Sequence, residues 1–227
     1  MKTQTQILWI SLSILVAIGL AFTVALVCMP HIEAAPQSTV TSPTDKPADA
    51  PAVPESPGAA LHFISNGDGT CVVAGLGGYT DAVLIIPEYA PSGERVTEIA
   101  AMAFYECQSI TTVHIPASVE RIGRLAFAAC PNLTIISVSP QNTSYRDLDG
   151  VLYTADCRLL LVYPARRVGS TTTVPVSTEQ IADMAFYQCQ NLSLVVYGGS
   201  AEQWELIRIG TRNWSLTASA KRFENCD

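Results

Sequence analysis

The amino-acid sequence predicts a β-rich solenoid with about 23 residues per unit and short helical turns. An apolar pattern that includes Phe104 recurs 23 residues later around Phe127, and a third copy around Phe186 lies 59 residues beyond the second. Short β-prone runs separated by glycine-rich turns precede these copies. A repeat period of about 20 to 29 residues is typical of stacked units, none of which can bury its apolar face alone.

Each unit combines two strand patterns with one turn. In the pattern Leu-x-x-Val-x-Ile the large apolar groups fall on one side of a strand, so successive units are expected to add parallel strands to a ladder. The Ala-Phe-x-x-Cys segment favours a tight helical turn, with Phe filling the interior and Cys serving as a small apolar residue. The positions shared by the first two copies are Val96/Val119, Ile99/Ile122, Ala103/Ala126, Phe104/Phe127, Cys107/Cys130, Ile110/Leu133, Val113/Ile136 and Ile115/Val138.

Residues 7–28 carry no charge and are long enough for a transmembrane signal-anchor helix, because a helix of that length spans roughly 33 Å. Lys2 precedes this stretch, and Glu33 is the first charge after it, so residues 1–6 are expected in the cytoplasm and the remainder outside the cell. The alternative is a cleaved signal peptide and a secreted protein. Cleavage after Ala35 would place Glu33 where a small residue is required.

Residues 29–60 are expected to form a disordered stalk that is rich in Pro, Ala, Ser and Thr, since they contain almost no large apolar side chain. One folded domain is expected over residues 61–227. It is divided into a cap at 61–95, repeats at 96–138, a hairpin insertion at 139–170, a repeat at 171–197 and a closing segment at 198–227.

This domain resembles the BspA-type leucine-rich repeats of bacterial surface proteins. The repeat from Val96 to Pro116 carries the resemblance, and residues 142–164 and 197–213 resemble the family's hairpin insertion and closing segment. The sequence departs from the family pattern at Thr178, where the repeat has Val, and at Tyr197, where it has Ile. The resemblance implies a solenoid at the cell surface that recognises or adheres to other proteins.

Composition and spacing argue against several other functions. The net charge is −7 and the basic residues are scattered, which argues against nucleic acid as a partner. There is no Cys-x-x-Cys pair and the three His are isolated, so no metal or other cofactor is expected. Cys107, Cys130 and Cys189 occupy one repeat position and are expected to be free core thiols. No catalytic constellation is recognisable, so neither an enzyme nor a small-molecule substrate is expected.

The outward positions of the strands are the candidate protein-binding face. Side chains alternate along a strand, and equivalent positions of successive units should form two rows. The row with Ile135 becomes apolar toward the third unit, which suggests a contact face for an unknown protein at the cell surface or in the matrix. A structural cell-envelope protein without a specific ligand is the alternative. The two expected rows are Thr112, Ile135 and Leu194, and His114, Ser137 and Val196.

Overall fold

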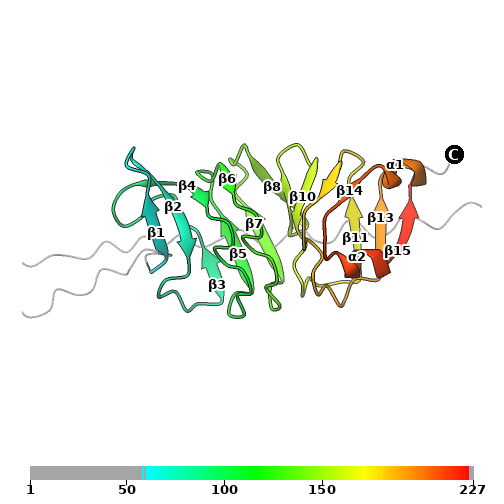
Figure 1. The fold of residues 1–227 in the computed structure, drawn as a ribbon, viewed down its shortest axis with the longest axis horizontal. Coiled ribbons are helices and arrows are strands. Elements are labelled where there is room, and N and C mark those ends of the chain that lie inside the picture. The colour runs from blue at the N-terminus through cyan, green and yellow to red at the C-terminus, as the bar shows by residue number, and fades with distance from the viewer. Residues whose placement is uncertain (1–57, 59, 225–227) are drawn as a thin grey trace, which may run out of the picture. The chain divides into compact units, whose positions relative to one another are not determined.

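The computed structural model describes residue 58 and residues 60–224 (Figure 1). The expected cytoplasmic segment 1–6, the anchor helix 7–28 and nearly all of the stalk 29–60 lie outside these described residues. Within them, no helix combines the length and the apolar character that crossing a membrane requires.

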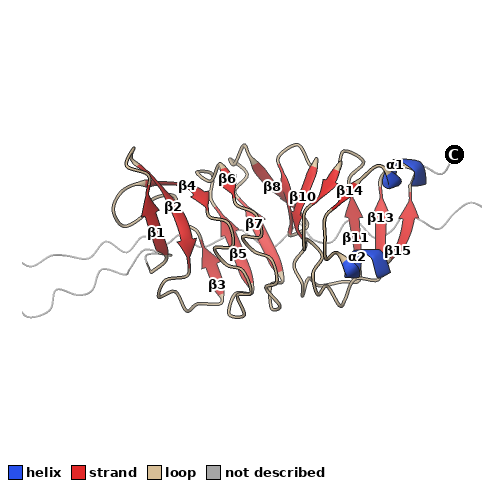
Figure 2. Cartoon of the chain, viewed as in Figure 1, coloured by secondary structure: helices blue, strands red, loops and turns tan. Residues whose placement is uncertain are grey.

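The described chain is built from fifteen strands in four sheets, with two short helices near its C-terminal end (Figure 2). The first sheet contains β1 (His62–Ser65), β2 (Thr70–Gly75), β4 (Arg95–Ile99) and β6 (Arg121–Ile122). The second contains β3 (Val83–Ile85), β5 (Thr112–Ile115) and β7 (Ile135–Val138). The third contains β14 (Arg208–Ile209), β12 (Gln180–Ile181), β10 (Leu159–Val162), β9 (Val151–Thr154) and β8 (Tyr145–Leu148). The fourth contains β11 (Thr171–Val174), β13 (Leu194–Tyr197) and β15 (Ala220–Phe223).

The 23-residue period is the register of the parallel ladders. Val113 of β5 pairs with Ile136 of β7, and all three of Leu84, Val113 and Ile136 are fully buried. On the return layer Ile99 pairs with Ile122 in the same way. Strands β3, β5 and β7 and strands β11, β13 and β15 together give six rungs, which confirms the predicted solenoid.

The predicted helical turn of each unit is wrong in its backbone conformation. In the first unit Met102 and Glu106 have φ of 59° and 55°, and the same left-handed pair recurs at repeat-equivalent positions in the other copies. The amides of Met102, Phe104 and Glu106 donate to carbonyls of the next unit at 2.9–3.1 Å instead of to their own turn. An α-helix directs every amide back along its own chain, so hydrogen bonding between units favours this alternating turn over a helix.

The predicted hairpin separates two hydrophobic cores. Strand β9 pairs antiparallel with both β8 and β10, and its side chains alternate between the two halves. Leu152 packs in the N-terminal core, whereas Val151 and Tyr153 pack in the C-terminal core. All three are essentially inaccessible to solvent. Strand β9 is therefore a single-strand partition that belongs to both cores.

Aromatic rings stack along each half of the solenoid. The Phe104 and Phe127 rings lie 5.3 Å apart with an interplanar angle of 10°. In the C-terminal half Tyr163 and Phe186 stack at 4.9 Å and 22°. The amide of Tyr163 donates to Ala185 as that of Phe104 donates to Ala126, so Tyr163 takes the repeat's Phe position within the hairpin insertion. The segment therefore contains a repeat unit that the sequence pattern does not reveal.

The repeat cysteines occupy core positions, as predicted. The five described cysteines, which are Cys71, Cys107, Cys130, Cys157 and Cys189, are all free and buried. Cys130 Sγ contacts the Phe104 carbonyl oxygen at 3.1 Å, and burial raises the pKa of this thiol to about 12. Burial likewise raises the pKa of Cys189 to about 12. Both thiols are therefore neutral at physiological pH.

The closing segment completes the C-terminal core. Helix α1 (Ala201–Glu205) starts at a capping box, in which Ser200 and Gln203 exchange side-chain and backbone hydrogen bonds. This helix places Trp204 edge-on against Tyr197, with ring centroids 5.3 Å apart. Helix α2 (Trp214–Ala218) buries Leu216. Tyr197, where the sequence departs from the repeat, is therefore the core contact for the closing segment.

Candidate functional site

The predicted outward positions of β5 and β7 lie side by side on one sheet. Thr112 pairs with Ile135 and His114 pairs with Ser137, so both expected rows begin in register. Nδ1 of His114 and Oγ of Ser137 are hydrogen-bonded to each other. Ile135 keeps 44% of its surface exposed.

The third member of each predicted row lies elsewhere. Leu194 and Val196 are on β13, which pairs with β11 and β15 in a separate sheet. The rows cannot continue because the hairpin insertion lies between β7 and β11. Val196 is also buried, with 3% exposure, and pairs with Thr173 and Arg222 on the flanking strands. The predicted six-residue face is therefore wrong in its extent.

The face extends in the opposite direction, to a residue that the sequence patterns did not identify. Val83 of β3 pairs with Thr112, and its side chain is 42% exposed. The actual outward row is thus Val83, Thr112 and Ile135. The run from Val83 to Ile86 is recognisable as a strand, but the longer spacing between it and Phe104 obscures its alignment with the later units.

The hairpin insertion adjoins one end of this face. The carbonyl of Gly150 accepts a hydrogen bond from the Ile136 amide at 3.1 Å. A Cβ atom at Gly150 would lie 2.8 Å from Cγ1 of Ile135, so only glycine allows this approach. Arg167, which is almost fully buried, donates to the Asp149 carbonyl at 2.9 Å and pairs with its carboxylate. The hairpin turn therefore packs beside Ile135 without covering it.

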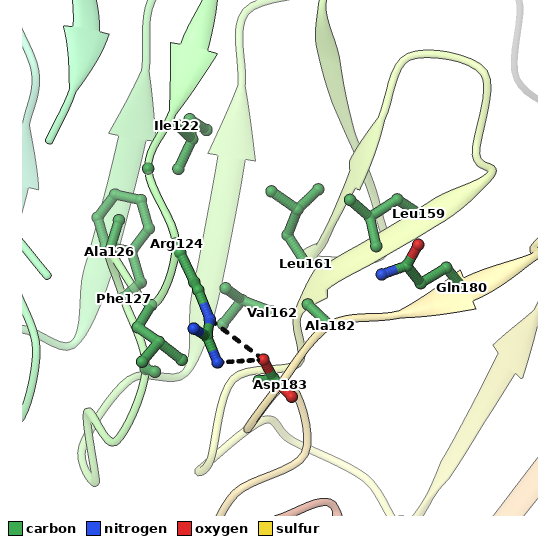
Figure 3. A pocket seen from close by; sticks show the side chains of 13 residues that line it. Ile122, Arg124, Ala126, Phe127, Leu159, Leu161, Val162, Gln180, Ala182 and Asp183 are labelled. Carbon is green, nitrogen blue, oxygen red and sulfur yellow. Dashed lines mark hydrogen bonds and ion pairs between the residues drawn. The ribbon is translucent and has the colours of Figure 1, made fainter. Parts of the chain in front are cut away.

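A cavity of about 390 Å³ opens on the other layer of the solenoid, between β6 and β10 (Figure 3). Leu159 and Leu161 of β10 line it on one side, and residues 122–128 line it on the other. Arg124 and Asp183 form an ion pair across it, with Nη2 and Oδ2 2.6 Å apart. No sequence pattern pointed to this site, because the cavity exists only where one unit faces the hairpin insertion.

The backbone along this cavity differs from that of the other turns. By the repeat register, the amides of Leu125, Phe127 and Ala129 correspond to the donors Met102, Phe104 and Glu106. Among the described residues, none accepts a hydrogen bond from any of these three amides. In the third copy the closing segment pairs two of the three equivalent donors: Met184 donates to the Thr211 carbonyl at 2.8 Å and Phe186 to Oδ1 of Asn213 at 2.8 Å, whereas no described residue accepts from the Gln188 amide.

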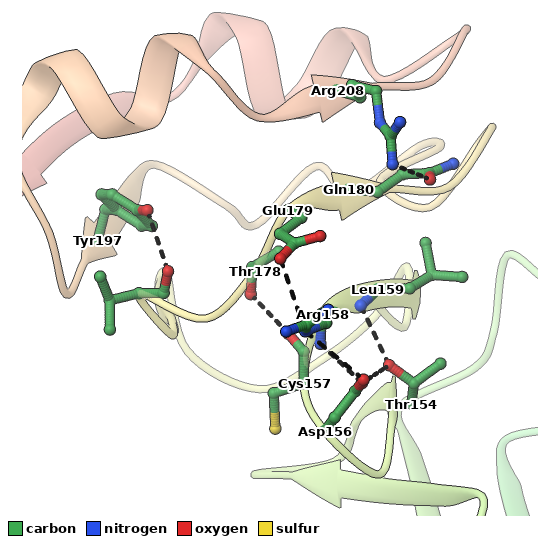
Figure 4. A network of polar contacts seen from close by, with 11 residues as sticks. Thr154, Asp156, Cys157, Arg158, Leu159, Thr178, Glu179, Gln180, Tyr197 and Arg208 are labelled. Atoms are coloured by element: carbon green, nitrogen blue, oxygen red, sulfur yellow. Dashed lines mark hydrogen bonds and ion pairs between the residues drawn. The ribbon is translucent and has the colours of Figure 1, made fainter.

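A polar network fixes the wall of the cavity that carries Leu159 and Gln180 (Figure 4). Oγ1 of Thr154 accepts a hydrogen bond from the Leu159 amide at 3.1 Å and donates to Oδ1 of Asp156 at 2.7 Å. The hydroxyl of Thr178 donates to the Cys157 carbonyl at 3.1 Å. The replacement of the repeat's Val by Thr178 thus provides a donor for a buried carbonyl.

The sequons Asn132, Asn142, Asn191 and Asn213 are built into the fold. The side-chain amide nitrogen of each donates to a backbone carbonyl. Asn142 donates to both Pro116 and Val119, at 2.8 and 2.9 Å. These four side chains therefore contribute hydrogen bonds to the folded structure.

Titratable groups form no metal centre in the part of the chain that the structure describes, where no cluster of three His, Cys, Asp or Glu occurs. The amide and hydroxyl of Thr211 donate to Asp183 and, with Arg124, lower the pKa of its carboxyl group. Asp183 therefore stays ionised and links the third unit to the closing segment.

The repeats match a known family. Residues 90–148 match the family described as "BspA type Leucine rich repeat region (6 copies)". Among solved structures, the pneumococcal vaccine antigen PcpA is similar, with 22% identity and a TM-score of 0.51 over 60% of this chain and 32% of that chain. A leucine rich cell surface protein from Faecalibacterium prausnitzii A2-165 has 30% identity and a TM-score of 0.46 over 58% of this chain and 38% of its own.

A leucine-rich repeat protein from Eubacterium ventriosum ATCC 27560 has 22% identity and a TM-score of 0.46, with 62% of this chain and 42% of that chain covered. The chain thus spans less than half the length of each of these structures. No curated protein sequence matches it. Residues 90–148 are thus similar to the BspA-type leucine-rich repeats, and the likeness to the pneumococcal antigen supports the same solenoid fold.

Proposed function

We propose that this chain is a membrane-anchored extracellular protein whose solenoid acts as a protein-binding or adhesion module. The exposed row of Val83, Thr112 and Ile135 carries the proposal, since its two aliphatic side chains are 42% and 44% exposed on a regular parallel sheet. Exposed apolar groups beside polar ones, here His114 and Ser137, are typical of protein contact surfaces. Bacterial leucine-rich repeat surface proteins of the same repeat type support the assignment.

The proposed anchor is the uncharged segment 7–28, with residues 1–6 in the cytoplasm and the repeats outside. Expression of the full chain in a bacterial host, followed by carbonate extraction of membranes, tests this. An anchored chain stays in the membrane pellet and its solenoid is digested by protease added to intact spheroplasts. Recovery of a shortened chain in the medium would support secretion after signal cleavage instead.

Binding is tested with the purified full-length chain in detergent, applied to immobilised extracellular-matrix proteins and to intact bacterial cells. Ile135→Asp and Val83→Asp should each abolish binding, because both place a charge in the apolar row. Val176→Asp is the matched control, since Val176 is 52% exposed and lies outside this sheet. A folded parent that binds none of these surfaces would favour the structural envelope protein without a specific ligand.

A further inference from the structure

We propose that the cavity between β6 and β10 binds an extended peptide segment of a partner protein, through the free amides of Leu125, Phe127 and Ala129. This groove lies on the return layer, not on the sheet of β3, β5 and β7, so the proposal does not depend on the strand face.

The first argument is the template that the fold itself provides. The turn at 102–106 donates its alternate amides to Arg124, Ala126 and Ala128 of the next unit at 2.9–3.1 Å. The turn at 125–129 repeats the same left-handed positions, with φ of 60° at Leu125 and 57° at Ala129. Leu125 and Phe127 of this row line the cavity, and Ala129 follows directly after its last lining residue on this side, Ala128. A peptide with carbonyls on alternate residues matches that row, because this is how the preceding junction is formed.

The second argument is the free-energy cost of leaving these backbone amides without hydrogen-bond acceptors. Phe127 is only 1% exposed, so its amide has little access to bulk water. Buried backbone amides without a partner are rare and cost about 1–3 kcal/mol each. The amides of Phe104 and Phe186, at the equivalent position of the other turns, are both paired, so the backbone conformation does not require such a loss at Phe127. A bound chain would remove this cost, which favours binding.

The third argument concerns the chemistry of the occupant. The outward side chains of β10, Leu159 and Leu161, are partly buried and give the cavity an aliphatic wall. A volume of about 390 Å³ is in the range of ligand sites, which is about 300–1,000 Å³. The cation at the rim, Arg124, is already paired with Asp183. An uncharged, extended segment with small apolar side chains fits these features.

The arrangement favours a peptide over an anion. The three amides are spaced two residues apart along the chain and point as a row, as in strand addition to a sheet edge. A site for a single anion requires amides that converge on one point. The edge of β6 is already partly closed, because the Ile122 amide donates to the Tyr145 hydroxyl at 2.8 Å. The open donors are thus confined to the turn.

The test uses a capped peptide based on residues 121–129, the segment that pairs with the preceding turn, with Arg121, Arg124 and Phe127 each replaced by Ala so that it is uncharged and has smaller side chains. Amide exchange of the full-length chain, purified in detergent, is followed by NMR with and without this peptide. We expect fast exchange at Leu125, Phe127 and Ala129 in the free chain and slowed exchange at these three amides on binding. Amides that are already as protected as that of Phe104 in the free chain would overturn the proposal, since ordered water or the chain itself would then fill the groove.

Two pairs of variants locate the binding site. Leu161→Asp should weaken peptide binding at least about tenfold, whereas Leu76→Asp, at another partly buried leucine that packs against the N-terminal core but lies outside the cavity, should leave it unchanged. Arg124→Ala, which opens the rim, should strengthen binding, and Arg121→Ala should not. Equal effects on peptide affinity within either pair of variants would contradict binding in the groove. The same holds for peptide-induced changes in chemical shift that are confined to β5 and β7, and for protection that requires self-association of the chain, measured by sedimentation.

Discussion

The turns around Phe127 and Phe186 share one backbone conformation but have different partners. Met184 and Gln188 repeat the left-handed φ of Leu125 and Ala129. Thr211 and Asn213 pair with Met184 and Phe186 of the C-terminal turn, whereas the corresponding donors Leu125 and Phe127 of the middle turn line a cavity. Within the described chain, the middle turn keeps this conformation although its only backbone hydrogen bonds with another unit come from the preceding one, so the pairing of a turn's own amides depends on the unit that follows.

The largest expected effect comes from making the C-terminal turn resemble the middle one. Asn213→Ala removes the acceptor for Phe186 and the donor to Ala182 and Gly210, at a residue that is 3% exposed. We expect a loss of about 2–3 kcal/mol in the free energy of unfolding. Urea titration measures this loss. Asn132→Ala, which removes one bond to the Gln108 carbonyl, is the control, and an equal cost would show that Asn213 is not a cap.

A smaller change, a gain in the free energy of unfolding, is expected when the two aromatic stacks are made alike. The hydroxyl of Tyr163 is buried without a hydrogen-bond partner among the described residues. In the other stack Phe127, which has no hydroxyl, packs on Phe104. Tyr163→Phe should raise the free energy of unfolding by about 1 kcal/mol. Thermal or urea unfolding measures the change. A marked destabilisation would show that the hydroxyl has a partner.

The same residue makes stability depend on alkaline pH. Burial raises the pKa of Tyr163 to about 12, above its ordinary value of 10.0. The folded chain therefore keeps a proton that the unfolded chain loses, so stability falls as the pH rises from about 10 toward 12. Urea midpoints at pH 8 and pH 11 should differ less in Tyr163→Phe than in the parent. An unchanged difference would mean that Tyr163 ionises normally.

A still smaller stabilisation, equal in the N-terminal and C-terminal halves of the solenoid, is expected from Asn at the left-handed positions of the turns. Glu106 and Gln188 are exposed and have φ of 55° and 56°, a region that Asn tolerates better than other side chains. Glu106→Asn and Gln188→Asn should each stabilise the chain by about 0.5 kcal/mol. Unequal gains, measured by urea unfolding, would show that the two turns do not share one local conformation.

The smallest effect is expected at the rim of the cavity. Arg121 and Arg124 are 75% and 73% exposed, and each pairs with a carboxylate, Glu98 or Asp183. Exposed ion pairs contribute about 0–1 kcal/mol, so Arg121→Ala and Arg124→Ala should leave the free energy of unfolding nearly unchanged. A large loss in Arg124→Ala alone would mean that this pair holds the two halves together.

The sequence predicted those parts of the fold in which one repeat unit directly follows another. The spacing of Phe104 and Phe127 gave the register, the core positions and the free cysteines, because each follows from the repeat. It could not predict the left-handed turns, since their stability comes from hydrogen bonds between units. Tyr163 lies 23 residues before Phe186, but it was not recognised as a repeat residue because Val162 and Arg166 stand where the repeat has Ala and Cys.

The candidate sites were less accessible to prediction. The alternation within β5 and β7 correctly placed Thr112, Ile135, His114 and Ser137 on one face. The extension to Leu194 and Val196 failed because a sequence pattern does not show which units are adjacent in space. The cavity forms where the hairpin insertion provides no acceptors for the amides of the turn at 125–129, so no local motif indicates it.

The partition formed by β9 has a mechanical consequence. Leu152 and Tyr153 are neighbours in the chain, yet their side chains belong to different cores. When tension is applied between residues 60 and 224, one core can open first. The other core then stays closed and keeps its contacts with its own face of β9. A solenoid tethered at a cell surface would then lengthen in two steps, with β9 retained by the second block until it also opens.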